Sequence, residues 1–235
     1  MVRRGTLHHV RYSGWMTDSG RREANRLWSL ILAAGGSSRL GTPKQLLRLG
    51  AQPLVSRAVT AAEAVTPGRV LVVLGAHALK LRLLLRRRHA GVRTVTNPGW
   101  SAGMAGSLAV GLSALPERAD AAVLLLSDQP GIDARALQRL VRAWRCRPAR
   151  PAAARYAGRL GVPAVLPRPL WAQARRLSGD VGARQLLRQC SGRTRAVEMP
   201  EAAFDVDSAE DGKRLASRDF VSTRARGDRC ARSRS

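Results

Sequence analysis

The chain has 235 residues, of which 45% are hydrophobic, and this suffices for the core of one α/β domain. Its formal net charge of +25 comes almost entirely from arginine, because its lysines are limited to Lys44, Lys80 and Lys213. Arginine stands in place of lysine throughout the chain, and a codon bias explains this composition better than selection for DNA binding does. Interleaved aromatic residues and a recognition-helix pattern are absent from the sequence, so we do not expect nucleic-acid binding. The charge would still attract polyanions such as nucleoside triphosphates.

Cysteine usage and hydropathy restrict the location of the protein. Cys146, Cys190 and Cys230 are odd in number and widely spaced, with no C-x-x-C pair and no histidine at zinc spacing beside them. This pattern predicts a reduced, cytoplasmic protein. The first residues lack the apolar core of a signal peptide, and no run of about 18 apolar residues could cross a membrane. We therefore expect no membrane partner.

The two ends of the chain differ from its middle. Residues 1–26 predict a basic flexible extension, or a start codon placed too early, and residues 217–235 predict an arginine-rich disordered tail. Between them, residues 27–216 alternate short apolar runs with helical patterns. This central part is predicted to form one α/β domain.

A glycine-rich loop follows the first apolar run. Residues 28–34 have the length of a buried strand, and the loop over 35–43 contains glycines and small hydroxyls. Backbone N–H groups together with two fixed cations, Arg39 and Lys44, would make a polyphosphate receptor. The spacing is neither that of a P-loop nor G-x-G-x-x-G. For Gly35 and Gly36 alone, an ordinary strand-to-helix turn is an equally good interpretation.

Alternating elements continue after this loop. The expected helices cover 44–49, 53–65 and 77–89, and the expected strands cover 69–74 and 92–96. A Gly- and Ser-rich segment over 97–108 then begins with a turn at Asn97 and Pro98, and Ser101 could cap the next helix. Such a segment at the carboxyl end of a strand is where α/β sheets bind ligands, although flexible glycines alone would look the same.

The strand expected over 121–126 is apolar at every position, as a central parallel strand should be. Asp128 follows it and would face the ligand crevice, where its carboxylate could hold Mg²⁺ jointly with substrate phosphates. The alternative role for Asp128 is to cap the next helix. Asp133 is better placed for that role, because it directly precedes the helix expected over 134–144.

The last third of the chain departs from simple alternation. Strands over 152–156 and 164–166 would form a hairpin-like piece that could wall a pocket, and a helix follows at Pro169. A second polar cluster over 178–187 opens another helix. In it, Arg184 could clamp a phosphate, or Asp180 could be an N-cap and Arg184 a surface residue.

Two acidic residues near the end of the domain are the last candidate site residues. After a short strand over 195–198, Asp205 and Asp207 would lie on one side of an extended segment, where one of them could join Asp128 on a metal ion. A short helix over 210–215 ends the domain. The sum of elements predicts the α/β class, with a three-layer, Rossmann-like, mostly parallel sheet and helices on both faces.

Four segments, in this order, resemble the MobA/MocA-like nucleotidyltransferases: LAAGGSSRLGTPKQLL (32–47), NPGWSAGMAGSL (97–108), LLLSDQP (124–130) and SGDVGARQLL (178–187). The closing FDVDSAED (204–211) is similar to the D-I-D-T-x-x-D element of that family. Within the family the chain resembles the molybdenum cofactor cytidylyltransferases, because it has LAAGG where the guanylyl branch usually has LAGG. Leu40, Ser208 and the two terminal extensions depart from the family pattern, but none of them removes a cation or a carboxylate.

The resemblance implies a fold of the nucleotide-diphospho-sugar transferase type and a Mg²⁺-dependent transfer of CMP from CTP to a molybdopterin-type cofactor, with release of pyrophosphate. It implies catalytic roles for Lys44, Arg39 and Asp128, and a metal ion shared by Asp128 and Asp207, with Asp205 as the alternative ligand. The expected nucleotide-binding residues are Leu32, Ala33, Ala34, Gly35, Gly36, Ser37, Ser38, Gly41, Asn97, Gly103 and Ser107. The expected acceptor-binding residues are Met104, Asp180, Gly182 and Arg184. A molybdenum hydroxylase or its chaperone would be the protein partner.

Two other functions fit the same motifs. The enzyme could transfer CMP, GMP or UMP to another phosphorylated acceptor, such as a sugar phosphate. A non-catalytic carrier could instead bind the molybdenum cofactor and pass it to a hydroxylase. The joint presence of Lys44, Asp128 and Asp207 argues against a carrier with a dead site.

Overall fold

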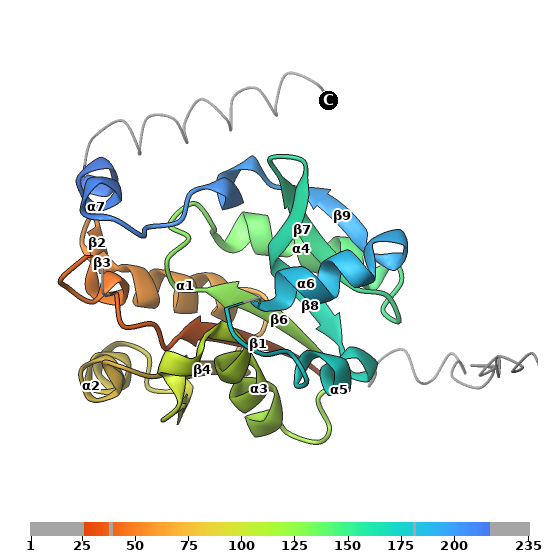
Figure 1. Cartoon of the computed structure of the whole chain (residues 1–235), viewed down its shortest axis with the longest axis horizontal. Helices are drawn as coiled ribbons and strands as arrows, with labels where there is room; N and C mark the ends of the chain where they lie inside the picture. The colour runs from red at the N-terminus through yellow and green to blue at the C-terminus, as the bar shows by residue number, and fades with distance from the viewer. Residues whose placement is uncertain (1–25, 38–39, 181, 217–235) are drawn as a thin grey trace, which may run out of the picture.

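The structure is a computed structural model that describes residues 26–37, 40–180 and 182–216. A seven-stranded sheet runs through it in the order β5-β4-β1-β6-β8-β7-β9 (Figure 1). The strands are β1 (Leu27–Ala33), β4 (Val70–Leu74), β5 (Arg93–Thr96), β6 (Ala121–Leu126), β7 (Ala152–Tyr156), β8 (Arg159–Pro167) and β9 (Arg195–Glu198). A separate ribbon pairs β2 (Arg48–Leu49) with β3 (Gln52–Pro53).

Most of the sheet is parallel, which confirms the predicted fold class. β1 pairs in parallel with β4 and β6, and β4 pairs in parallel with β5. β8 is antiparallel to both β6 and β7, whereas β7 is parallel to β9. The β7–β8 hairpin is therefore the departure from alternation that the sequence indicates. Because β8 runs against β6, its first residues lie at the edge of the sheet where β6 ends.

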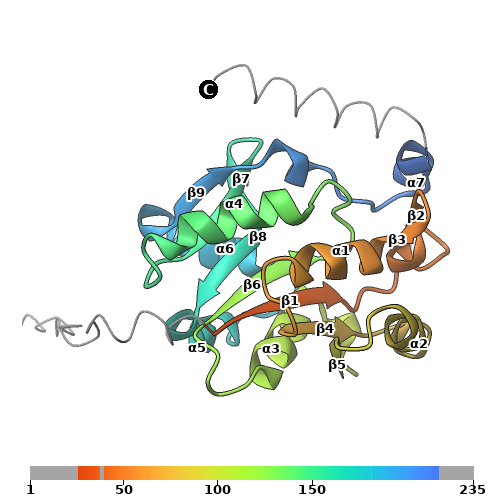
Figure 2. The same cartoon turned by 180° about the vertical axis from the view of Figure 1, so that it is seen from behind.

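Helices cover both faces of the sheet. One face carries α1 (Leu54–Glu63), α2 (Ala78–Arg88) and α4 (Ala134–Arg145), and the other carries α3 (Met104–Ala114), α5 (Trp171–Ala174) and α6 (Gly182–Gln189). Figure 1 shows α3 and α6 in front of the sheet. Figure 2, which shows the molecule from behind, has α1 and α4 in front of the sheet. The alternation of side chains along each strand builds the two cores: in β1, Ile31 packs on the first face and Leu30 on the second.

A further helix, α7 (Ala209–Ala216), packs beside β2 at one end of the sheet. Within the described residues, five 3₁₀ helices connect the other elements: η2 (Lys44–Leu46), η3 (Trp100–Ala102), η4 (Arg168–Leu170), η5 (Ser191–Arg193) and η6 (Pro200–Ala203). None of the helices in the part of the chain that the structure describes is both long and apolar enough to cross a bilayer.

The structure corrects two local predictions and confirms one. Residues 44–49 are not a helix, because η2 ends in one turn and Gly50, at φ +61°, turns the chain into the β2–β3 ribbon. Ser101 does not cap α3, since it lies in η3, and the residue before α3 is Gly103. Asp133 caps α4 as expected: its Oδ1 accepts a hydrogen bond from the Ala136 N–H at 2.9 Å.

Candidate active site

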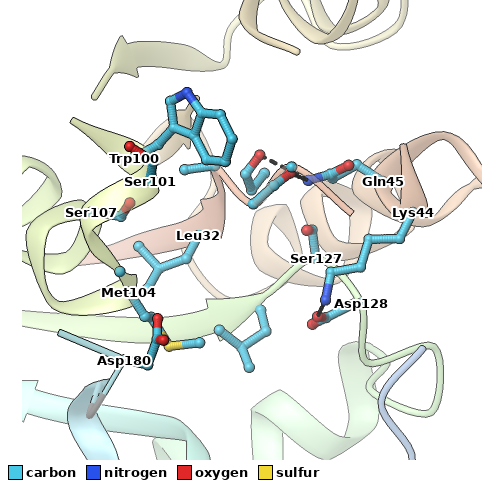
Figure 3. Close-up of a pocket in the computed structure, with 16 residues that line it drawn as sticks. Leu32, Lys44, Gln45, Trp100, Ser101, Met104, Ser107, Ser127, Asp128 and Asp180 are labelled. Carbon is cyan, nitrogen blue, oxygen red and sulfur yellow. Dashed lines mark hydrogen bonds and ion pairs between the residues drawn. The ribbon is translucent and has the colours of Figure 1, made fainter. Parts of the chain in front are cut away.

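A hollow of about 260 Å³ opens at the carboxyl ends of β1 and β6 (Figure 3). This edge is where α/β sheets bind their ligands. The sequence-predicted residues that line it are Leu32, Ala33, Ala34, Gly35, Gly36, Lys44, Gly103, Met104, Ser107, Asp128 and Asp180. The hollow is thus built from the two strand tips, the glycine-rich loop, the start of α3 and the segment before α6.

Other predicted residues lie around the hollow without lining it. Asn97 is buried, and its Nδ2 donates a hydrogen bond to Ser107 Oγ at 3.0 Å, so it positions a lining residue. Ser37 Oγ accepts a hydrogen bond from the Lys44 N–H at 2.9 Å and closes the loop. Gly41 has a positive φ in the same loop, and Gly182 lies against Met104. Arg184 lines a different hollow. Ser38 and Arg39 lie outside the described residues.

Several lining residues were not among those predicted from the sequence. They are Gln45, Trp100, Ser101, Leu126 and Ser127. Trp100 belongs to the N-P-x-W segment, so the resemblance could have indicated it. The Trp100 ring lies so close to Gly36 that a Cβ there would come within 2.8 Å of it. The loop therefore packs directly on the Trp100 ring, and this close approach favours glycine at that position.

A lysine joins two carboxylates at one side of the hollow. Lys44 Nζ lies 2.5 Å from Asp128 Oδ2 and 2.8 Å from Asp207 Oδ1. Burial alone would lower the pKa of Lys44, but the charges and hydrogen bonds of Asp128 and Asp207 outweigh it and raise the pKa above its usual value. Lys44 is therefore a fixed positive charge at neutral pH.

A third acid completes this cluster. Burial, followed by the negative charge of Asp128, raises the pKa of Asp205 to about 6. Asp205 Oδ1 and Asp128 Oδ1 are both buried, and neither has a hydrogen-bond partner among the described residues. Buried carboxylate oxygens of this kind are costly unless a cation or a donor satisfies them.

The acids can hold part of a metal site but not a complete one. Within the described ranges, no group of three His, Cys, Asp or Glu side chains is arranged to hold a metal ion. Mg²⁺ and Mn²⁺ commonly take one or two carboxylates and complete their coordination with substrate phosphates and water. The unpartnered oxygens of Asp128 and Asp205, with Asp207 beside them, fit that kind of shared site.

Val206 fixes the position of the two flanking acids. Its side chain is fully buried with Leu54 and Leu215, and its N–H donates a hydrogen bond to the Asp128 carbonyl oxygen at 3.0 Å. The backbone between Asp205 and Asp207 is thereby tied to the tip of β6. The segment 205–207, near the end of the domain, therefore places two carboxylates in the same site as Lys44.

Gln45 holds the glycine-rich loop from beneath. Its side chain is 1% exposed, and Nε2 donates hydrogen bonds to the Gly35 carbonyl oxygen at 2.8 Å and the Ala33 carbonyl oxygen at 3.2 Å. These bonds join the residue after Lys44 to the end of β1. They fix the first residue of the loop against the segment that follows the loop.

Gln45→Leu is expected to weaken binding of the nucleoside triphosphate by about tenfold and to lower the free energy of unfolding by about 1–3 kcal/mol, because it removes both buried donors at similar volume. Thermal unfolding and the KM for the nucleotide measure the two effects. Gln173→Leu is the matched control, since Gln173 is exposed and bonds to Gln189, and neither residue lines the hollow. A KM and a Tm equal to those of the control variant would contradict this role.

The fold and the site together define a class of protein. A glycine-rich loop, a lysine and carboxylates meet at the switch region of a mostly parallel sheet, which is the arrangement of a nucleotide-binding α/β enzyme. The model of the MobA-like NTP transferase domain matches residues 29–195, and the chain belongs to this family. It is therefore a nucleotidyltransferase, as the sequence motifs predict.

Solved structures of similar proteins share this fold. Rv0371c from Mycobacterium tuberculosis H37Rv is 32% identical, with a TM-score of 0.67, over 81% of this chain and 99% of that chain. Its complex with manganese matches at 29% identity and a TM-score of 0.66, over 80% and 97%. A nucleotidyl transferase from Methanothermobacter, at 19% identity and a TM-score of 0.65 over 80% and 95%, shares the fold. A comparison with curated proteins gave no match.

Proposed function

We propose that this nucleotidyltransferase transfers CMP from CTP to the phosphate of a molybdopterin-type molybdenum cofactor and releases pyrophosphate. The observation that carries the transfer chemistry is the contact of Lys44 with Asp128 and Asp207 at the end of the glycine-rich loop. The choice of CTP and of the acceptor rests on the sequence motifs. Ala34 follows Ala33 at the point where the guanylyl branch usually has glycine, and both alanines line the hollow.

The loop and its cations would bind the triphosphate. Gly35 and Gly36 line the hollow, where their backbone N–H groups would bind phosphate oxygens, and Lys44 supplies the charge that would stabilise those oxygens in the transition state. Arg39 keeps the catalytic role that the resemblance implies, with Ser37, Ser38 and Gly41 in the same loop. The Lys44 stem is flexible, so its ammonium can exchange a carboxylate oxygen for a phosphate oxygen.

The acids would hold the metal ion. Asp128 and Asp207 are the proposed Mg²⁺ ligands, with Asp205 as the alternative, and the unpartnered Oδ1 of Asp128 supports this assignment. When bound, the ion would neutralise charge on the phosphates and act as a Lewis acid. The manganese in the mycobacterial structure supports the use of a divalent cation.

The opposite side of the hollow would receive the acceptor. Met104 and Asp180 line it there, and Figure 3 shows their side chains close together. An acceptor phosphate oxygen would attack the α-phosphorus of CTP, and the bond to the β-phosphate would break as pyrophosphate leaves. This displacement needs positioning and charge neutralisation but no protein nucleophile. A molybdenum hydroxylase or its chaperone would then receive the dinucleotide.

The direct test incubates the full chain with molybdenum cofactor, Mg²⁺ and each nucleoside triphosphate in turn. We expect pyrophosphate release with CTP and a cytidine dinucleotide product identified by its mass. Release with GTP alone would overturn the choice of base, and release with a sugar phosphate alone would overturn the choice of acceptor. Cofactor binding without pyrophosphate release would favour a carrier.

A further inference from the structure

A second hollow, of about 530 Å³, lies between the turn of the β7–β8 hairpin and α6. We call it the arginine groove, and its lining residues are Gly158, Arg159, Leu160, Arg184, Arg188 and Ser191. Arg184 and Arg188 are one helical turn apart on α6, so they present their side chains on one face of the helix. Arg159 approaches from the start of β8. Two segments that are distant in sequence thus bring three guanidinium groups to one depression.

The groove is positively charged and unpartnered. No carboxylate is among its lining residues, and no hydrogen bond or ion pair engages the side chains of Arg159, Arg184 or Arg188 within the part of the chain that the structure describes. Elsewhere on the same hairpin, Arg155 pairs with Glu198 at 3.4 Å. Guanidinium groups gathered without counter-charges repel one another, and an oxyanion held by two or more of them would relieve this repulsion.

The groove lies beside the candidate active site. Asp180 lines the first hollow and Arg184 lines the groove, and four residues of chain span at most about 14 Å. Gly182, between them, lies against Met104 of the first hollow, where a Cβ would come within 2.8 Å of the Met104 Sδ. The pairing of β8 with β6 also places the groove at the edge of the sheet where β6 ends. Ala164 pairs with Leu124 in an antiparallel ladder, so the earlier residues of β8, including Arg159, lie toward the carboxyl end of β6. The two hollows are therefore neighbours, at a separation that one extended substrate can span.

We propose that the arginine groove binds a second anionic group of the acceptor, separate from the phosphate that attacks the nucleotide. This proposal rests on the proposed function, because it assumes that the enzyme has an acceptor. It limits that acceptor to molecules with two separate anionic groups. Planar guanidinium groups bind phosphate and other oxyanions through paired N–H donors. A simple sugar monophosphate has no second anion to place in the groove.

The first experiment tests the groove without any assumption about the acceptor. Inorganic phosphate is titrated into the full chain while the arginine Nε–Hε resonances are followed by NMR, with Arg→Gln variants for assignment. We expect saturable shifts of Arg159, Arg184 and Arg188, and loss of the Arg159 shift in the double variant Arg184→Gln/Arg188→Gln. The control variant, Arg86→Gln/Arg87→Gln on α2, should keep the phosphate-induced shift of Arg159. Shifts that do not saturate, or that match those of the α2 arginines in the wild-type protein, would overturn the proposal.

The second experiment connects the groove to the acceptor. The Kd for molybdenum cofactor should rise at least about tenfold in Arg184→Gln/Arg188→Gln, because two charged hydrogen-bonding groups are lost, while the Kd for CTP with Mg²⁺ stays unchanged. Equal affinity of the wild-type protein and the double variant for the cofactor would overturn the role proposed for the arginine groove, but it would not contradict the proposed function. If the wild-type protein binds no cofactor while phosphate saturates the groove, the proposed acceptor is wrong and the groove stands.

Discussion

Asp128→Asn is expected to lower pyrophosphate release by about 10³-fold or more without disrupting the fold, since it removes a charge on which both Mg²⁺ and Lys44 would depend. Asparagine keeps the shape of the side chain but carries no negative charge, and Lys44 then has Asp207 as its remaining described partner. The charge of Asp128 also helps to raise the pKa of Asp205, so its removal relieves a repulsion in the metal-free protein. Initial rates over a Mg²⁺ titration measure the loss, and Tm reports the fold.

Asp133→Asn is the matched control for this change. Asp133 follows the same strand but caps α4, and asparagine caps a helix about as well as aspartate. The control should therefore keep both its activity and its Tm. An Asp128→Asn enzyme with the Mg²⁺ dependence of the wild type would refute the metal assignment.

The central sheet could be predicted from the sequence because its strands carry strong local signals. Residues 121–126 are apolar at every position, and the expected strand coincides with β6. A fully apolar run of six residues is too short for most helices and fits a strand that is buried on both faces. The same reasoning places Asp128 at a strand tip, and the structure places it at the hollow.

The segment after the glycine-rich loop could not be predicted in this way. Leu46 and Leu47 fit a helical pattern, yet the chain forms one 3₁₀ turn and a short ribbon. Leu47 and Leu49 pack in a small core around Val206 and Leu215, which lie far along the chain. Such long-range packing overrides local propensity, and no window of the sequence contains it.

The grouping of the site residues shows the same limit. Lys44 and Asp207 are 163 positions apart, so only the resemblance to a family could bring them together beforehand. Asp180 and Arg184 look like one polar cluster in the sequence, but they line different hollows. The position of Arg184 depends on the β7–β8 hairpin, which packs against α6 and supplies Arg159.

Lys44→Ala is expected to lower kcat by about 10²-fold or more, because it removes a positive charge that would bind the phosphates most strongly in the transition state. The raised pKa of Lys44 shows that the folded protein favours its charged form, so this charge is present throughout the range below its usual pKa of 10.5. Its contribution to stability is lost only as the pH rises through the raised value. Alanine has no titratable side chain, so the defect of Lys44→Ala should persist when the assay pH is lowered.

Two further variants separate the charge of Lys44 from its shape. Lys44→Arg keeps the charge but replaces a compact ammonium with a planar fork, so we expect partial activity between that of Lys44→Ala and the wild type. Lys80→Ala on α2 removes a lysine that does not line the hollow and should leave kcat unchanged. If Lys44→Ala turns over CTP at the rate of Lys80→Ala, the ammonium has no catalytic role. Its contact with Asp128 and Asp207 would then serve only to balance the charges of the two acids.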